Sequence, residues 1–328
     1  MKRRILTIAV VLIALAALAW VLFLRGGPPA DVEEATDRIA AVVVDAPAPE
    51  GSELLGAKST DTRAVSIGAG DERFTYNTVF TRESWTNAKG DGVQRTSQSY
   101  EWASDADEKK AREQRAEQLG GKKIQGGELP AGVVPVGPLD DAERVVLVCR
   151  VSAGAVGGLL SQLARAGDFP DSPDDLWDEV EDAAEAYGDD DDTVIWNSWG
   201  TITADLKAGQ TVLSGEQRAT AIRALGFAEG VSVIDAEEDP AGRPAVGLRL
   251  SLGGNSQDVW FDSETGWIAQ TVFSGNSDVT AAASAPSGTA PQQSSEYVLT
   301  ESSIVDKMPG DLEPAKAGVV RGSLRCAS

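Results

Sequence analysis

Histidine is absent from all 328 residues, and its absence removes several classes of chemistry. Without an imidazole the chain has no Ser-His-Asp or Cys-His catalytic apparatus, no histidine ligand for zinc and no histidine pH switch. Cysteine occurs only twice, at Cys149 and Cys326, so one chain cannot build a zinc site from four cysteines. A glycine-rich phosphate-binding loop followed by lysine is also missing.

Basic residues are scarce relative to acidic ones. The chain holds 29 Lys and Arg against 51 Asp and Glu, a formal net charge of -22. A domain this acidic repels phosphate backbones, so we expect no binding to nucleic acid. Net charge bears on solubility rather than on fold, so the acidity equally fits a salt-adapted or simply a very soluble protein.

The acidic residues do not form a recognisable catalytic or metal-binding pattern. Four consecutive acids at residues 189–192 are a candidate for calcium, but they lack the spacing of an EF-hand loop. They precede a predicted helix, where acids complement the helix dipole, and we favour that structural role. No spacing selects a carboxylate pair of the kind that hydrolyses glycosides. We therefore assign no catalytic residue, no metal and no cofactor, and we expect a protein that is not an enzyme.

One long apolar run begins at Ile5 and ends at Leu24, and its 20 residues are uncharged. At about 1.5 Å per residue, a helix of that length spans about 30 Å, the thickness of the hydrocarbon core of a bilayer. Three basic residues at 2–4 precede the run, and only Arg25 follows it closely. This charge asymmetry predicts a single-pass protein of the cell membrane, with its N-terminus in the cytoplasm and the rest outside.

A cleaved signal peptide is the alternative, because residues 17–19 have the small-residue pattern of a cleavage site. The apolar run continues past them and exceeds the roughly 7 to 15 residues usual in a cleaved segment, so we expect a retained anchor. We therefore predict, in chain order, a cytoplasmic stub (1–4), a transmembrane helix (5–24), a juxtamembrane linker and helix (25–50), an extracytoplasmic domain (51–310) and a C-terminal tail (311–328).

Hydrophobic periodicity predicts the helices and strands of the first part of the extracytoplasmic region. Residues 31–44 place apolar side chains on one helical face. Apolar and polar residues alternate in 74–86 and 93–102, as in the two strands of a hairpin that has one solvent-exposed face. Residues 53–67 are a weaker strand candidate. A charged stretch at 105–119 predicts an exposed helix, and a Gly- and Pro-rich loop follows at 120–138.

The second half predicts a helical block and then a series of strands. Ser172 before Pro173 is a strong helix start, and Ser214 with Gln217 has the spacing of a capping box, so helices cover about residues 173–225. The period then changes from helical to alternating, with turn residues between the segments, which predicts an antiparallel meander. The predicted strands are 231–236, 245–252, 258–262, 267–273 and 297–305, with an Ala/Ser/Pro-rich loop at 280–295. Residues 145–151 are predicted as a further strand or a buried turn. The fold class is α+β.

Two smaller sets of residues bear on stability and binding. In an extracytoplasmic domain two thiols most often pair, so we expect a disulfide between Cys149 and Cys326; the alternative is a buried free Cys149 and a frayed tail. Tryptophans outside the anchor are candidates for a ligand groove, although packing in the core is the commoner role of such residues. The candidates are Trp196, Trp199, Trp260 and Trp267.

The motifs at residues 83–86 with 90–95, 217–234, 239–244 and 261–266 resemble those of a family of actinobacterial single-pass membrane proteins of uncharacterised function. Such proteins are often encoded beside extracytoplasmic-function sigma factors. The same order of elements, over roughly residues 30–310, looks like the lipoprotein-carrier architecture. That resemblance implies a curved antiparallel sheet with helices on its concave side, although fold does not fix function.

The resemblance and the missing catalytic residues together favour a membrane-tethered binding or sensing module. Its ligand would be a lipid, a lipoprotein or another envelope protein, and lipid carriage predicts an apolar cavity between sheet and helices. The alternatives are a regulatory protein that binds an anti-sigma or other envelope partner and, with less support, a carboxylate-dependent envelope hydrolase.

Overall fold

A computed structural model describes most of the chain beyond residue 26. The described residues are 27–46, 48–67, 73–119, 145–151, 158–188, 190–208, 212–276, 292–310, 312, 314–315, 320–321 and 324–326. The predicted stub (1–4), the predicted transmembrane helix (5–24) and the predicted loop at 120–138 lie outside them. Within the described part, no helix combines the length and the apolar composition needed to cross a bilayer.

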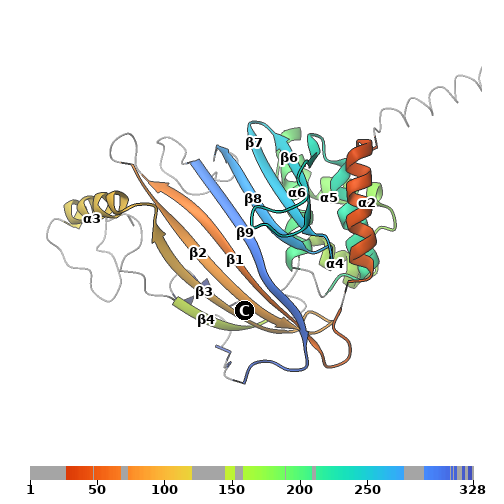
Figure 1. The fold of residues 1–328 in the computed structure, drawn as a ribbon, viewed down its shortest axis with the longest axis horizontal. Helices are drawn as coiled ribbons and strands as arrows, with labels where there is room; N and C mark the ends of the chain where they lie inside the picture. Colours follow the sequence, from red (N-terminus) through yellow and green to blue (C-terminus); the bar gives the residue numbers. More distant parts are fainter. Residues whose placement is uncertain are drawn as a thin grey trace, which may run out of the picture.

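The described strands build a nine-stranded antiparallel sheet that is open and curved (Figure 1). Its spatial order is β4-β3-β2-β1-β9-β8-β7-β6-β5, which is two runs of sequential neighbours joined where β1 pairs with β9. This confirms the predicted antiparallel sheet. The strands are β1 (Leu54–Ile67), β2 (Phe74–Thr86), β3 (Gly92–Trp102), β4 (Val145–Val151), β5 (Val231–Ile234), β6 (Ala245–Leu252), β7 (Asn255–Asp262), β8 (Ile268–Asn276) and β9 (Gln292–Val305).

Strand β9 begins earlier than the sequence predicts. Residues 292–295 were expected to end a loop, but they pair with β8 and, from Ser294, with β1. Their side chains are polar or small, so no apolar alternation marks them as a strand. Hydrogen bonds to two neighbouring strands stabilise this segment instead of apolar burial.

Helices cover one face of the half of the sheet formed by β5 to β9, and a separate helix, α3, packs on the far end of β2 and β3 (Figure 1). The predicted helix starts are present: the Ser172 side chain accepts a hydrogen bond from the Asp175 N–H, and Ser214 and Gln217 form a capping box. The helices are α2 (Ala30–Val44), α3 (Asp105–Leu119), α4 (Leu159–Ala166), α5 (Pro173–Glu185), α6 (Asp191–Ala208) and α7 (Gly215–Ala224), which a short 3-10 helix η2 (Leu225–Phe227) extends.

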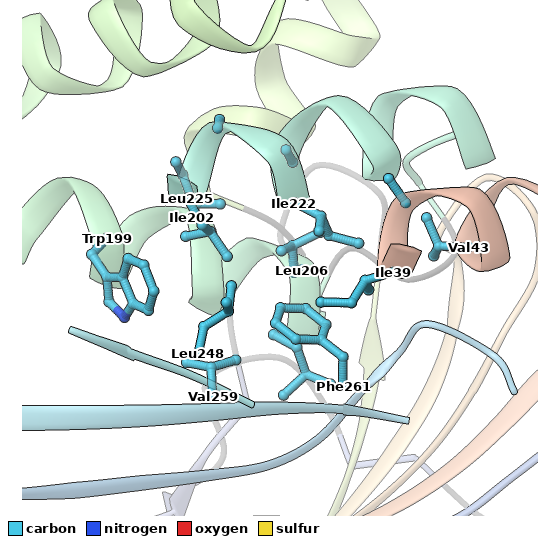
Figure 2. Close-up of a cluster of buried hydrophobic side chains, with 14 of the residues drawn as sticks. Ile39, Val43, Trp199, Ile202, Leu206, Ile222, Leu225, Leu248, Val259 and Phe261 are labelled. Carbon is cyan, nitrogen blue, oxygen red and sulfur yellow. The ribbon is translucent and has the colours of Figure 1, made fainter. Parts of the chain in front are cut away.

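The main core lies between these helices and strands β6 and β7 (Figure 2). Helix α6 contributes to this core the side chains at positions i, i+4, i+7 and i+11, which lie on one face of the helix. We call this set, Ile195, Trp199, Ile202 and Leu206, the α6 core stripe, and all four are buried. Leu248, Val259 and Phe261 meet it from the sheet. Each such side chain contributes about 1.5 to 3 kcal/mol when fully buried.

A buried ion pair fastens the turn between β5 and β6. The Asp239 carboxylate, which is fully buried, lies 2.6 Å from the guanidinium of Arg243. That guanidinium also donates to the carbonyl of Ala269 at 3.1 Å and to the carbonyl of Leu299. Arg243 therefore links the turn to β8 and β9 through its fork of donors.

The turn between β7 and β8 fits closely against α2. One oxygen of Asp262 accepts hydrogen bonds from the N–H groups of Glu264 and Thr265, and Gly266 closes the turn at φ +68°. A Cβ added at Gly266 would lie 2.7 Å from the Cβ of Val43. Glycine is needed here both for the left-handed backbone and for the close approach of the helix.

Replacement of Gly266 tests this contact. We expect Gly266→Ala to lower the free energy of unfolding by about 2 to 4 kcal/mol, because it combines backbone strain with a steric clash. Gly242→Ala is the matched control, since Gly242 has φ +77° but no atom within 4 Å of an added Cβ. It should lose only about 1 to 2 kcal/mol. Equal losses in urea denaturation of the two variants would contradict the packing role of Gly266.

The C-terminal tail is attached to β4. Cys149 in β4 forms a disulfide with Cys326, with their Cα atoms 5.3 Å apart. The N–H of Ala315 donates to the carbonyl of Val148 at 2.7 Å, which adds a second attachment. Beside β4, the short strands β10 (Val320–Arg321) and β11 (Leu324–Arg325) pair with each other.

The disulfide spans 177 residues of sequence, so it should restrict the unfolded chain strongly. The chain-entropy model gives about 5 kcal/mol for such a loop, and measured values are typically about 2 to 4 kcal/mol. We expect Cys326→Ala to lower the thermal midpoint, and a reducing agent to lower that of the wild type to the same value. The prediction is wrong if reductant leaves the wild-type midpoint unchanged, and the variant serves as the reductant-insensitive control.

Candidate ligand-binding site

A cavity of about 1420 Å³ lies between the sheet and helices α4, α5 and α6. Strands β1, β7, β8 and β9 form its other wall. Cross-strand partners such as Asp61 and Tyr297, or Thr271 and Tyr297, share one face of the sheet, and that face points toward the helices. The cavity is therefore lined by elements that are distant in the sequence.

Helix α6 presents two adjacent faces, one to the core and one to the cavity. The second face lies one residue around the helix from the α6 core stripe, about 100° away. We call it the α6 cavity face, and it consists of Trp196, Gly200, Ala204 and Lys207. Its two middle positions are small residues, which leaves space between the helix and the sheet.

The apolar part of the wall is built around an aromatic pair. The rings of Trp196 and Phe273 meet edge to face, with centroids 6.0 Å apart and an interplanar angle of 76°. Leu159 of α4 and Val180 of α5 extend this surface. Tyr187, just after α5, also lines the cavity and is 85% exposed. These side chains can hold the apolar part of a ligand.

A buried carboxylate holds α4 against α6. Asp205 accepts hydrogen bonds from the N–H of Leu160 at 2.7 Å and from the N–H of Gly158, which are orphan donors at the start of α4. Burial raises the pKa of Asp205, and these two hydrogen bonds oppose the rise. An added Cβ at Gly158 would lie 2.9 Å from both carboxylate oxygens, so glycine permits this contact.

Lys207 places a cation deep in the same cavity. Its Nζ lies over the ring of Tyr297, 4.9 Å from the centroid. Burial lowers the pKa of Lys207 to about 8; the charge of Asp61 opposes this fall, and those of Arg82 and Arg63 add to it. Among the described residues, no carboxylate oxygen lies within 4.0 Å of this nitrogen.

The four tryptophans predicted as candidates for a groove do not share one site. Only Trp196 lines the cavity. Trp199 belongs to the α6 core stripe, and Trp267 is buried in the same core. Trp260 points to the opposite face of the sheet, because Val259 and Phe261 on either side of it point into the core (Figure 2). Its ring lies against Gly247, where an added Cβ would be 2.8 Å away.

Sequence reasoning missed the residues that make the cavity distinctive, namely Lys207, Phe273 and Tyr297. The spacing of Trp196, Gly200, Ala204 and Lys207 was visible as a second face of α6, but its small residues did not mark it as a wall. Phe273 and Tyr297 reach the cavity only because β8 and β9 are neighbours in the sheet.

Two acids of the described part that bear on possible sites, Asp61 and Asp190, have structural partners. Asp61 accepts hydrogen bonds from Arg63 at 3.1 and 3.2 Å. Asp190, in the acidic run before α6, accepts them from the N–H and hydroxyl of Thr193, and these bonds lower the pKa of Asp190. No group of three metal-ligating side chains occurs among the residues described. The acidic run is thus engaged in starting a helix.

Comparison with known proteins yields no relative: no family model matches the chain, and no curated protein or solved structure is significantly similar to it. The chemistry of the cavity is therefore the basis for an argument about function.

The lowered pKa of Lys207 predicts a distinct dependence of stability on pH. The folded state releases this proton near pH 8, whereas the unfolded chain keeps it to about pH 10.4. In that window the unfolded state binds more protons, so stability should rise with pH. We expect the difference in unfolding free energy between wild type and Lys207→Met to shift in favour of the wild type from pH 8 to pH 10 in urea titrations.

Lys207→Arg is the control for this measurement, because guanidinium stays charged throughout the window. The difference between Lys207→Arg and Lys207→Met should therefore stay constant with pH. If the unfolding free energy of the wild type changes with pH in the same way as that of Lys207→Arg, burial does not lower the pKa of Lys207.

Proposed function

We propose that the protein is a membrane-tethered, extracytoplasmic binding or sensing module that holds an amphipathic ligand, such as a lipid or the acyl part of a lipoprotein, between its sheet and helices. The cavity is the observation that carries the proposal. Its volume of about 1420 Å³ exceeds the roughly 300 to 1000 Å³ of most small-molecule sites, which suits a long or branched ligand.

The cavity opens to solvent, since Tyr187 and Ala204 in its wall are exposed, so water fills it when no ligand is bound and a ligand can enter. An apolar aromatic pair beside polar and charged side chains fits a ligand that has both kinds of surface.

Two further features support the proposed location and the absence of catalysis. Disulfides persist in oxidising compartments, so the bond between Cys149 and Cys326 agrees with a domain outside the cytoplasm. The carboxylates Asp61 and Asp205 of the cavity wall are engaged with Arg63 and with backbone N–H groups. A hydrolase that needs two free acids therefore has less support than a binding module.

Filling the cavity tests the proposal. Ala204 lies on the α6 cavity face, so Ala204→Trp should place an indole where the ligand lies. Native extraction of the full-length protein followed by mass spectrometry should detect a bound lipid with the wild type and lose at least about nine-tenths of it with the variant, as a tenfold weaker site would. Both proteins should unfold at similar temperatures.

Ala116→Trp is the matched control, because Ala116 is also an exposed helical alanine but lies on α3, away from this cavity. Lipids around an N-terminal anchor would accompany all three proteins equally, so only the difference reports on the cavity. Equal lipid content in Ala204→Trp and Ala116→Trp, or no bound lipid in the wild type, would refute the proposed function.

A further inference from the structure

Two cations, Arg63 and Lys207, line one end of the cavity around the carboxylate of Asp61, and the exposed Arg82 lies beside them outside the lining. On the sheet, Asp61 and Arg63 alternate along β1, and Arg82 follows two residues after the partner of Asp61 on β2, so all three share the face toward the helices. Lys207, on α6, places its ammonium over the ring of Tyr297. Tyr297 is the residue of β9 that lies opposite Asp61 in the sheet. We call Arg63, Arg82 and Lys207 the cationic cluster.

Acids in the described part of the chain pair with only one member of this cluster, Arg63. Asp61 forms its hydrogen bonds with Arg63, so that pair is neutral. Among the described residues, neither Arg82 nor Lys207 has a carboxylate within 4.0 Å. Lys207 is therefore the cation of the cavity lining that has no acidic partner in the described part, and the exposed Arg82 adds a second positive charge nearby.

The other acids in the cavity wall do not reach the cluster. Glu296 points to the opposite face of the sheet from Tyr297, where it accepts a hydrogen bond from Gln270 at 2.5 Å. Asp205 lies two residues before Lys207 on α6, about 200° around the helix, and accepts its hydrogen bonds from the start of α4. In a chain with a net charge of -22, a cavity cation without an acidic partner among the described residues is a local reversal of sign.

From this arrangement we infer that the cavity takes an amphipathic acid, with its carboxylate or phosphate head at Lys207 and its apolar chain along Trp196 and Phe273. The inference rests on the proposed function and names the chemical class of its ligand. An acidic head would supply the missing counter-charge, and a hydrogen bond between ionised groups is among the stronger kinds. The apolar chain would cover the aromatic pair, which a free inorganic anion would leave exposed.

The expected ligand also explains the position of Tyr297. Its ring forms the floor beneath the ammonium, a favourable cation–π contact, while the open side of Lys207 faces the cavity. Binding of an anion would stabilise the charged amine and raise its pKa in the complex. Affinity should therefore fall as the pH rises above about 8, where the free protein loses this charge.

The test uses the full-length protein and two fluorescent probes that differ only in charge, a long-chain polyene carboxylic acid and its methyl ester. At pH 7 the wild type should bind the acid at least about tenfold more tightly than the ester, as expected for a hydrogen bond to a charged group. Lys207→Met should reduce this ratio to about two to three, because the exposed and solvent-screened Arg82 contributes little, and Lys207→Arg should retain most of it. From pH 7 to pH 10 the ratio should fall in the wild type but not in Lys207→Arg.

Lys58→Met is the matched control. Like Lys207→Met, it removes one lysine charge. Lys58 is on β1 but lies on the face of the sheet opposite to the cavity, where it forms an ion pair with Glu301. The acid-to-ester ratio should stay unchanged in this variant. A ratio that falls equally in both Met variants would show a long-range charge effect and overturn the assignment of the head group to Lys207.

Three outcomes separate this inference from the proposed function. If acid and ester bind equally well to the wild type, the cavity binds apolar chains and the head-group assignment is wrong, while the proposed function stands. If neither probe binds, both are wrong. If inorganic phosphate displaces the acid as effectively as dodecyl phosphate does, the site binds a free anion, and the amphipathic ligand is rejected.

Discussion

The pairing of β1 with β9 is the contact on which the rest of the architecture depends. These strands lie at opposite ends of the domain sequence, and their antiparallel register runs from Leu54 with Val305 to Ala64 with Ser294. On one side β1 to β4 follow in order, and on the other side β9 to β5 follow in reverse order. Without this pairing the two meanders would be separate sheets with two additional exposed edges.

The cavity follows from how helices are distributed over the joined sheet. Helices α2 and α4 to α7 lie over the half formed by β5 to β9, whereas the half formed by β1 to β4 extends beyond them (Figure 1). Where the helical layer ends, α6 turns small residues toward β9 and β1 instead of a core stripe. Asp205 fixes the position of α4 there through the start of that helix, so the space is held open by defined contacts.

Local patterns in the sequence predicted most of the elements. The Ser172 cap, the capping box at Ser214 and the α6 core stripe each depend on residues within one or two turns of helix, so one segment contains the whole signal. Alternation found most strands in the same way. Residues 292–295 escaped because backbone pairing with two neighbours, not apolar burial, stabilises them.

The cavity was less predictable because its residues come from distant segments. Trp196 and Trp199 are equally aromatic and three residues apart, yet one lines the cavity and the other fills the core. Periodicity could separate their faces but could not say which face has space above it. Tyr297 and Lys207 are separated by about 90 residues of sequence, and their contact exists only once β9 has joined the sheet.

The charge of the protein therefore acts on two length scales. The net charge of -22 governs solubility and repels polyanions, but salt screens exposed charges beyond about 8 to 10 Å. Inside the cavity, screening is weaker, and Lys207 interacts mainly with the few groups that surround it. An acidic protein can thus present a cationic site, because binding of a ligand at short range depends on the charges that surround the site and not on the net charge of the chain. The net charge predicts that nucleic acid is not a partner, whereas the arrangement of Asp61, Arg63, Arg82 and Lys207 bears on what the cavity holds.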